Sequence, residues 1–534
     1  MSRSKIIFVT GGVTSSLGKG IVASSLGNLF QSRGYKTTII KLDPYLNVDP
    51  GTLNPYEHGE CYVTDDGAEA DLDLGHYERF LDIPMSQLNN VTTGSIYKNV
   101  IERERKGDFL GKTVQVIPHI TDEIKKRILL LETKKKFKII IVEIGGTVGD
   151  IESLPYIEAL RQLKFERRDD VCVVHLTLLP FLNSTGEIKT KPTQHSVKTM
   201  LQSGVQPDVI VCRTEINLTE KVKNKIALFC NVHYECVIEA INASTIYQVP
   251  SLMLDQHLDL VVAHKIGINK INKIDNSLWE KRLRKLKNPK EKYTVAIIGK
   301  YVELKDSYKS IYESLIHASA LLGKGIEVKW LHSEKLRPQN IKNKLKDCNG
   351  VIVAPGFGDR GVEGKILAVK YIRENNIPFL GICLGMQVAV IEFARNVCGF
   401  KNAHSTEMNG KTPHPVIDLM KNQTDIVNKG GTMRLGSYMC CLHKDSISLA
   451  AYQEKLIYER HRHRYELNND YRQMLLENGM VFAGINEDLD LVEVIELKDH
   501  PWFVGVQFHP EYKSSFINPH PLFISFVKSL YLDS

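Results

Sequence analysis

The chain has 534 residues, a formal net charge of +7 and 43% hydrophobic residues. This length exceeds one hydrophobic core and predicts two to four domains, at about 100–200 residues per domain. The small charge gives no argument for a nucleic-acid partner, and we see neither a signal-peptide pattern nor an apolar stretch of about 18 residues, so we expect a cytoplasmic protein without membrane contact. The ten cysteines form no Cys-x-x-Cys pair, which argues against a zinc ribbon and for buried, reduced thiols.

The N-terminal stretch Ile6–Gly20 has the layout of a phosphate-binding site. Its apolar start, Ile6–Val9, predicts a buried strand, and Ile21–Phe30 has the apolar spacing of a helix. The loop between them is rich in Gly and Ser and ends in a Gly-Lys pair. Backbone N–H groups, the helix N-terminus and the charge of Lys19 would face an anion there. An ordinary strand–helix turn is the alternative interpretation.

The match to the P-loop pattern is imperfect at two positions. Val13 stands where the pattern requires Gly, and Gly20 stands where it requires the Ser or Thr that binds Mg²⁺. If a nucleotide binds here, acidic residues from elsewhere must hold the metal. The apolar run Lys138–Val142 predicts a strand that ends in Glu143, and a carboxylate at that edge can reach the metal of a nucleotide on a neighbouring loop.

The remainder of the first half alternates strands and helices, which favours a parallel α/β sheet. Further strands are predicted at Thr37–Lys41, Val171–Leu176 and Val209–Cys212. The acidic segment Thr64–His76 predicts a surface loop or the wall of a site. From Lys265 to Lys292, Asn, Lys and Arg dominate, and we interpret this stretch as a basic, partly helical linker rather than a nucleic-acid site.

The βα rhythm restarts after the linker. Strands are predicted at Tyr293–Ile298, Glu327–Leu331, Val351–Ala354, Phe379–Ile382 and Phe503–Phe508. The predicted fold class is therefore α/β, with two doubly wound, mainly parallel α/β domains joined by a basic linker. The predicted bounds are 1–266 for the first domain, 267–292 for the linker and 293–534 for the second domain.

A second chemical centre is predicted around Cys383. This residue lies between a strand and a helix and is flanked by Gly, as in a nucleophile elbow with Cys in place of Ser. His509 and Glu511 follow another strand, where alternation puts them on one side as a base and its orienting acid. The glycine loop Ala354–Gly358 can lend a backbone N–H to an oxyanion. The alternative, a structural buried cysteine, leaves this combination unexplained.

The run Glu459–Glu466 contains three Arg and two His. A metal site is one interpretation. We favour alternating cations on a partly exposed strand, with one Arg available to bind a carboxylate ligand.

Motifs in both halves resemble known families. Gly381–Gln387 together with Phe508–Glu511 resembles the class I (triad) glutamine amidotransferases. Five further strings occur in matching order over nearly the whole chain and resemble the CTP synthase family: Val9–Gly20, Lys41–Gly51, Asp71–Glu78, Val142–Asp150 and Lys189–Ser196.

The resemblance implies that ATP phosphorylates O4 of UTP and that ammonia from glutamine then displaces the phosphate to give CTP. It implies Mg²⁺ on Asp73 and Glu143, a catalytic role for Lys19, and a triad of Cys383, His509 and Glu511. It further implies GTP as an allosteric activator, CTP as an inhibitor and a homotetramer. The partners would be UTP, ATP and glutamine, with no nucleic acid.

The resemblance also implies three sets of ligand-binding residues. The ATP set is Ser16, Leu17, Gly18, Lys19, Gly20, Ile21 and Asp73. The UTP/CTP set is Ser15, Asp150, Ile151, Glu152, Lys189, Thr190, Lys191, Pro192, Thr193, Gln194 and Lys225. The glutamine set is Gly356, Leu384, Gly385, Met386, Gln387, Glu407 and Arg464, with the N–H groups of Gly356 and Leu384 forming the oxyanion hole.

Two features depart from the family pattern. Pro355 replaces the first Gly of the usual Pro-Gly-Gly-Phe-Gly loop, and proline has no N–H to donate, so we expect Gly356 to donate instead. The segment Glu407–Gly430 is short and rich in Asn.

Three rival interpretations remain. A P-loop amidoligase of the cobyrinic acid amide synthase type has the same two halves, but Lys189–Ser196 argues against it. A partitioning-type P-loop ATPase would leave the Cys–His–Glu half without a role. A polymer-forming or regulatory protein that has lost catalysis would not need to keep Cys383, His509, Glu511 and Lys19.

Overall fold

The computed structural model describes residues 3–51, 53–419 and 433–531. The chain folds into two compact units, the first made of Met1–Asp49 and His76–Glu280 and the second of Pro50–Gly75 and Lys281–Ser534. The segment Pro50–Gly75 thus comes from the N-terminal half but packs with the second unit. The predicted domain bounds are continuous in sequence and assign Pro50–Gly75 to the first domain, so they differ from the structure in this segment.

The first unit is built on one seven-stranded sheet whose strand pairs are all parallel. Side chains of its central strand β1 alternate between two buried faces, because Ile6 and Phe8 join one core while Ile7 and Val9 point away from it. This strand therefore reads as a continuous apolar run, as buried parallel strands do. In spatial order the strands are β11 (Val237–Ala240), β10 (Val209–Arg213), β7 (Val171–Leu178), β1 (Lys5–Gly11), β6 (Ile139–Ile144), β2 (Thr37–Asp43) and β5 (Asn90–Thr92).

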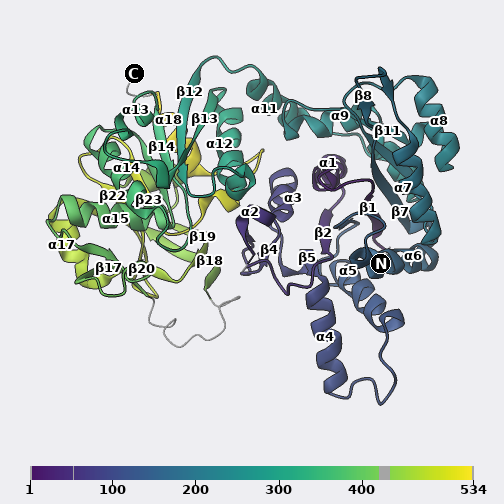
Figure 1. Cartoon of the computed structure of the whole chain (residues 1–534), viewed down its shortest axis with the longest axis horizontal. Coiled ribbons are helices and arrows are strands. Elements are labelled where there is room, and N and C mark those ends of the chain that lie inside the picture. The colour runs from purple at the N-terminus through teal and green to yellow at the C-terminus, as the bar shows by residue number, and fades with distance from the viewer. Residues whose placement is uncertain (1–2, 52, 420–432, 532–534) are drawn as a thin grey trace. The chain divides into compact units, whose positions relative to one another are not determined.

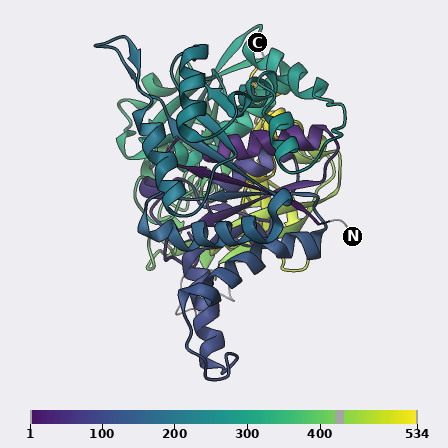
Figure 2. The ribbon, with the colours of Figure 1, turned by 90° about the vertical axis from the view of Figure 1, so that its right-hand side faces the viewer.

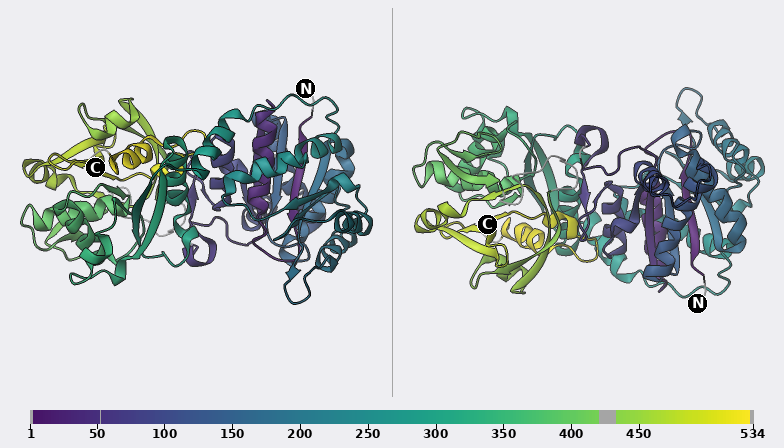
Figure 3. Two further views of the ribbon diagram at one scale, coloured as in Figure 1. Left: turned by 90° about the horizontal axis from the view of Figure 1, so that it is seen from above. Right: turned by 90° about the horizontal axis from the view of Figure 1, so that it is seen from below.

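Helices cover both faces of this sheet (Figure 3). A short hairpin, β8 (Phe181–Leu182) and β9 (Glu187–Ile188), follows β7. The helices are α1 (Lys19–Ser32), α4 (Thr93–Arg105), α5 (Thr121–Lys135), α6 (Leu154–Arg167), α7 (Lys191–Gln202), α8 (Glu220–Cys230), α9 (Val249–Asp255) and α10 (Leu258–Lys265). Helices α3 (Asp73–Leu81) and α11 (Ser277–Lys287) each begin in one unit and end in the other.

Helices α4 and α5 project from the body of the first unit as an arm (Figures 1 and 2). The arm carries exposed apolar side chains, among them Ile101, Leu110 and Ile117. Within the described part of the chain, no helix combines the length and apolarity needed to cross a membrane.

The second unit contains a nine-stranded mixed sheet. Its first five strands are parallel, and the other four pair antiparallel. The strands are, in spatial order, β13 (Gly325–His332), β12 (Lys292–Gly299), β14 (Gly350–Val353), β15 (Phe379–Ile382), β23 (Phe503–Val506), β22 (Leu491–Leu497), β21 (Met480–Asn486), β18 (Arg434–Leu442) and β19 (Leu456–His463).

Two hydrophobic cores lie on opposite faces of this sheet, since Ala296 and Ile298 of β12 enter one and Val295 and Ile297 the other. A small sheet is formed by β16 (Ala403–Ser405), β17 (His414–Leu419) and β20 (Tyr465–Leu467). The helices are α12 (Lys309–Leu322), α13 (Ile341–Leu345), α14 (Val362–Glu374), α15 (Leu384–Asn396), α16 (Ile447–Tyr452), α17 (Arg472–Glu477) and α18 (Pro521–Ser529).

The predicted class of two mainly parallel α/β domains is confirmed, and so is a partly helical linker, which contains α11. The surface-loop interpretation of Thr64–His76 is wrong. Together with α2 (Pro55–His58), the hairpin of β3 (Tyr62–Val63) and β4 (Glu69–Ala70) packs into the second unit, where Thr64 and Glu69 are buried. The segment predicted to be rich in Asn lies outside the described residues from 420 to 430.

Candidate active sites

The loop between β1 and α1 is held in a strained conformation. Val13 and Ser16 have positive φ values of 78° and 59°, and Gly18 at the helix N-cap has φ 90°. Such angles are uncommon for residues other than Gly and cluster at ligand-binding sites. The side chains from Val13 to Ser16 are exposed. The loop therefore presents its residues to solvent around the N-terminus of α1.

Two contacts tie this loop to the segment after β6. The Lys19 ammonium donates to the Gly146 carbonyl at 2.6 Å, and the Val148 N–H donates to the Gly11 carbonyl at 2.8 Å. The same segment continues to Asp150, whose Oδ2 accepts from the Thr147 N–H at 2.8 Å. The structure thus joins the predicted ATP loop to the segment that leads into Asp150, Ile151 and Glu152 of the predicted pyrimidine set.

Glu143, the first predicted metal ligand, lies at the carboxyl end of β6 opposite Val9 of β1. Its buried carboxylate accepts from the Lys41 ammonium at 2.8 Å and from the Tyr77 hydroxyl at 2.5 Å. Mg²⁺ is commonly held by one or two carboxylates together with phosphate oxygens and water, so an ionised carboxylate beside a phosphate loop fits this ion. Among the described residues, no group of three or more His, Cys, Asp or Glu is arranged to hold a metal.

Asp73, the second predicted metal ligand, is the first residue of α3 and belongs to the second unit. Its N–H donates to Asp71 Oδ1 at 3.0 Å. A carboxylate in the first turn of a helix is favourably placed against the helix dipole.

A cavity of about 450 Å³ lies beside the phosphate loop in the first unit. Its residues come from the loop, from the segment after β6 and from the first three turns of α7: Val13, Thr147, Val148, Lys191, Pro192, His195, Ser196 and Thr199. Thr193 and Gln194 of the same helix are buried and hydrogen-bond locally, to Thr177 and Thr190. Of the predicted pyrimidine set, Lys191 and Pro192 therefore line this cavity.

Lys189 directly follows β9 of the short hairpin, and Lys225 lies on α8. The Lys189 ammonium donates to Glu187 Oε2 at 2.6 Å. This hydrogen bond, with smaller effects of the Lys189 and Lys225 charges, lowers the pKa of Glu187. No described contact joins either lysine to the cavity residues.

A buried relay that the sequence did not predict links the phosphate strand to α7. His175 of β7 bonds through Nδ1 to the Thr10 hydroxyl at 2.8 Å and through Nε2 to the Ser196 hydroxyl at 2.8 Å. Burial, with the nearby Lys19 charge, lowers the pKa of His175 to about 3, so the ring is neutral. A Cβ on Gly12 would lie 1.6 Å from Ser196 Oγ, so only Gly permits this approach. In the sequence, this buried contact is indicated only by His175 itself, the single polar residue in the apolar run Val171–Leu176.

In the second unit, Cys383 occupies a sharp turn between β15 and α15. Its φ of 53° and ψ of −104° are rare for a residue with a side chain, as at a nucleophile elbow. The turn depends on the flanking glycines, because a Cβ on Gly385 would lie 2.2 Å from the Val353 carbonyl oxygen. Cys383 Sγ is 3.9 Å from the Arg462 carbonyl oxygen and 3.6 Å from Gln507 Nε2.

His509 and Glu511 lie beside Cys383 and are both buried. His509 Nδ1 is 2.7 Å from Glu511 Oε1, and the imidazole stacks on Tyr512 with ring planes 7° apart. Burial disfavours the imidazolium, but the charges of Glu511 and of the Cys383 thiolate outweigh it and raise the pKa of His509 to about 10. The pair therefore keeps a proton on the imidazole next to the sulfur.

The glycine loop after β14 is fixed through its carbonyls. The Ala354 carbonyl accepts from Lys365 at 2.7 Å, and the Phe357 carbonyl accepts from Lys300. The Gly358 N–H donates to Glu407 at 2.7 Å. No hydrogen bond within the described chain occupies the N–H of Gly356 or of Leu384, the first residue of α15. Both groups remain available to an oxyanion.

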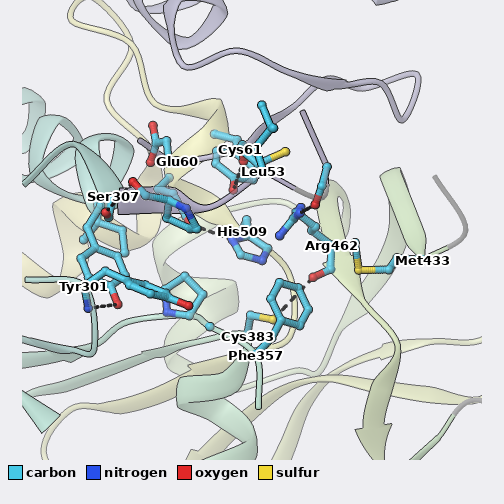
Figure 4. A pocket seen from close by; sticks show the side chains of 18 of the residues that line it. Leu53, Glu60, Cys61, Tyr301, Ser307, Phe357, Cys383, Met433, Arg462 and His509 are labelled. Atoms are coloured by element: carbon cyan, nitrogen blue, oxygen red, sulfur yellow. Dashed lines mark hydrogen bonds and ion pairs between the residues drawn. The ribbon is translucent and has the colours of Figure 1, made fainter. Parts of the chain in front are cut away.

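A cavity of about 340 Å³ opens over Cys383 (Figure 4). It is lined by the triad, by the glycine loop, by Arg462 and Arg464 of the Glu459–Glu466 run, and by Gly51, Leu53, Pro55, Glu60 and Cys61. Gln387 lies beneath it and donates to the Tyr465 carbonyl at 2.8 Å. Of the predicted glutamine set, Gly356 and Arg464 line this cavity.

The segment Pro50–Gly75 forms one wall of the cavity and is anchored by two arginines. Arg460 donates to Asp65 at 2.6 Å, to the Tyr62 hydroxyl at 3.0 Å and to the Val63 carbonyl at 3.1 Å. Arg462 donates to Glu69 at 2.9 Å and to the Gly51 carbonyl at 2.8 Å. The interpretation of Glu459–Glu466 as a partly exposed strand therefore holds only in part: Glu459, Arg460, His461 and His463 are buried, while the other four residues are half-buried. Arg464 lines the cavity, as expected for an Arg that binds a carboxylate ligand.

Comparisons with known proteins agree with this two-part architecture. The model for the CTP synthase N-terminus matches residues 5–268, and the model for class-I glutamine amidotransferase matches residues 303–529. A CTP synthase of Christiangramia forsetii is 61% identical over 530 residues, spanning 99% of this chain and 97% of that one. A CTP synthase of Bacteroides fragilis is 58% identical over 529 residues, spanning 99% of each chain.

A solved structure, the glutaminase domain of Trypanosoma brucei CTPS with bound acivicin, is 35% identical and covers 45% of this chain and 93% of that one, with a TM-score of 0.42. The matches to whole curated chains span both units in one order, which favours this family over the cobyrinic acid amide synthase alternative. The chain belongs to the CTP synthase family.

Proposed function

We propose that the protein is a glutamine-hydrolysing CTP synthase, which uses ATP to aminate UTP with ammonia released from glutamine. The observation that carries the proposal is the meeting of the phosphate loop, the segment through Asp150 and the start of α7 at one edge of the first sheet. A kinase-like loop beside a second ligand cavity suits phosphorylation of one nucleotide by another.

In the second unit, the Cys383 thiolate attacks the amide carbon of glutamine. The N–H groups of Gly356 and Leu384 receive the negative charge that develops on the amide oxygen. The His509 imidazolium gives its proton to the leaving nitrogen, so ammonia departs and a thioester remains on Cys383. His509 then takes a proton from water, which attacks the thioester and releases glutamate. Glu511 keeps Nδ1 bonded throughout, so Nε2 faces the reacting atoms.

In the first unit, Lys19 and the N-terminus of α1 orient the phosphates of ATP for transfer of the terminal phosphoryl group to O4 of UTP. Ammonia then adds at C4, and phosphate leaves to give CTP. Glu143 and Asp73 would hold Mg²⁺, which would neutralise phosphate charge when bound. Lys19 moves from the Gly146 carbonyl to the phosphates, which its flexible side chain permits.

The family resemblance supports three finer proposals. GTP activates the glutaminase reaction, CTP inhibits the enzyme, and the protein is a cytoplasmic homotetramer. The exposed apolar side chains on the arm of α4 and α5 are a surface suited to contact between copies of the chain.

The test is CTP formation from UTP, ATP and Mg²⁺ with either glutamine or ammonia, followed by the absorbance of the cytosine base. We expect product with both nitrogen sources. Absence of CTP with ammonia would overturn the proposed function.

Cys383→Ala separates the two reactions. We expect loss of at least about 10³-fold in glutamine-dependent CTP formation, because no nucleophile remains. The ammonia-dependent rate should stay within about twofold of the wild type. Cys441→Ala, a partly exposed cysteine of β18, is the matched control. If Cys383→Ala lost both rates, Cys383 would have a structural role instead.

A further inference from the structure

Lys365 is a buried lysine that the proposed mechanism does not use. It lies in the first turn of α14, on the side that carries Val362, Ile366 and Val369 into the core, and its side chain is 0% exposed. A cation near a helix N-terminus opposes the helix dipole. Lysine is almost never fully buried unless paired. The position therefore carries two unfavourable features that an apolar residue would avoid.

The Lys365 ammonium has one hydrogen-bond partner in the described chain, the Ala354 carbonyl oxygen at 2.7 Å. No carboxylate of the described residues forms an ion pair with it. Burial, helped by the nearby Lys300 charge, lowers the pKa of Lys365 to about 7, while the Cys383 thiolate acts in the opposite direction. Lys365 is therefore a buried cation bonded to the start of the glycine loop, whose residues Pro355, Gly356 and Phe357 line the cavity over Cys383.

The Ala354 carbonyl lies at the point where β14 ends and the glycine loop begins. The Ala354 N–H donates to the Ile298 carbonyl of β12 at 3.0 Å, so the sheet fixes the N-terminal side of Ala354. The next residue, Pro355, has no N–H and a restricted φ. The loop therefore has no backbone donor at this point, and the carbonyl of Ala354 is the group by which its start is held.

The orientation of this carbonyl bears on the next peptide group. The ring of Pro355 leaves ψ as the one free rotation between the Ala354–Pro355 and Pro355–Gly356 peptides. The far end of the loop is held at Phe357 by Lys300 and at Gly358 by Glu407. With both ends held, rotation of the peptide that carries the Gly356 N–H is restricted. Without the bond to Ala354, the start of the loop can rotate.

We propose that Lys365 is a positioning residue of the glutaminase site, which holds the Ala354 carbonyl so that the Gly356 N–H points at the oxyanion. The inference rests on the proposed glutaminase function of this unit. Lys365 does not touch the substrate and takes no proton from it. It acts through the loop, so its loss should affect the step in which an oxyanion forms.

Lys365→Met tests the proposal, because Met has similar length and no donor. Lys370→Met on the exposed part of the same helix is the matched control. We expect kcat for glutamine hydrolysis to fall about 10- to 100-fold, somewhat less than the loss of an oxyanion donor itself. The KM for glutamine and the ammonia-dependent CTP rate should change by less than about twofold.

Alkylation of Cys383 by iodoacetamide, followed by mass spectrometry of the peptide that contains it, gives the distinguishing measurement. Alkylation needs the thiolate but forms no oxyanion, so Lys365→Met should react at the wild-type rate. Lys365→Arg, which keeps a donor, should recover part of kcat and gives a second variant if the Met protein does not fold.

An unchanged kcat in Lys365→Met would overturn the positioning role, and so would a parallel fall in alkylation, which would place the effect on the thiolate. Failure of the proposed function itself is a separate result, since it would appear as missing glutamine hydrolysis in the wild type.

Discussion

At the scale of single residues, His509 shows how two neighbouring groups determine the protonation state of an imidazole. Its imidazole is buried, which alone would favour the neutral ring, yet the Glu511 carboxylate at 2.7 Å and the Cys383 sulfur keep it protonated. An imidazolium can give a proton to the leaving amide nitrogen, which then departs as ammonia, without waiting for a proton from water. The pKa of about 10 then marks the upper pH limit of this step.

Glu511→Gln should move that limit. Glutamine carries no charge, so the pKa of His509 falls and the imidazolium is lost at a lower pH. We expect the alkaline limb of the glutaminase pH profile to shift down by at least about one unit, and kcat at neutral pH to fall about 10- to 10⁴-fold. The pH dependence of glutamine hydrolysis measures both. Glu454→Gln, an exposed carboxylate of the same unit, should leave the profile unchanged. An alkaline limb that stays in place would contradict the assignment of the proton to His509.

At the scale of elements, the relay of Thr10, His175 and Ser196 joins β1, β7 and α7 in the first unit. His175→Ala removes both bonds and leaves two buried hydroxyls without this partner. We expect a loss of about 2–5 kcal/mol in the unfolding free energy of this unit, and at least about a tenfold fall in ammonia-dependent CTP formation. Glutamine hydrolysis in the second unit should persist. Thermal unfolding and the two assays check this.

The exposed His264 on α10 provides the control for this prediction. His264→Ala should change neither assay. Retention of the full ammonia-dependent rate in His175→Ala would show that the relay does not position α7.

The wall segment Pro50–Gly75 is held by Arg460 of β19 in a similar way. Arg460→Met removes the bonds to Asp65, Tyr62 and Val63. We expect amide hydrogen exchange in the β3–β4 hairpin to quicken about tenfold or more, which corresponds to a loss of about 1.4 kcal/mol. Mass spectrometry of peptides from the hairpin measures the change. Arg472→Met, which removes a pair with the exposed Asp490, should leave this exchange unaltered.

Much of the fold follows from local pattern, while pairings across the chain do not. The strand Phe379–Ile382 was predicted to the residue, because a short apolar run that follows Pro378 and ends before the turn at Cys383 has one simple interpretation. The burial of Arg460 was missed, since its partner Asp65 lies 395 residues away and no local spacing reveals it. Lys365 interrupts an apolar helix face, a signal that points to a buried lysine but not to its acceptor. The antiparallel half of the second sheet was missed because no local spacing reveals which strands pair with each other.

At the scale of the whole molecule, the exposed apolar side chains on the arm of α4 and α5 lead us to expect association between copies of the chain. Ile101 is 56% exposed on α4, and Leu110 beyond its end is 88% exposed. Ile101→Asp places a charge in this apolar surface and should shift the assembly from the proposed tetramer to smaller species, as measured by light scattering after size-exclusion chromatography. Leu489→Asp, at a half-exposed site of the second unit, should keep the wild-type mass. An unchanged mass for Ile101→Asp would exclude the arm as an interface.

The exchange of Pro50–Gly75 means that the polypeptide passes between the two units three times, after Asp49, after Gly75 and after Glu280. The linker is therefore not a seam at which the protein can be divided. A fragment cut there would contain every residue of the triad but would lack Leu53, Glu60 and Cys61 from its cavity. Any displacement of that wall would also act, through covalent bonds, on the loop that follows β2 and on helix α3. The proposed glutamine hydrolysis and UTP amination are thus linked by three stretches of backbone rather than by one linker.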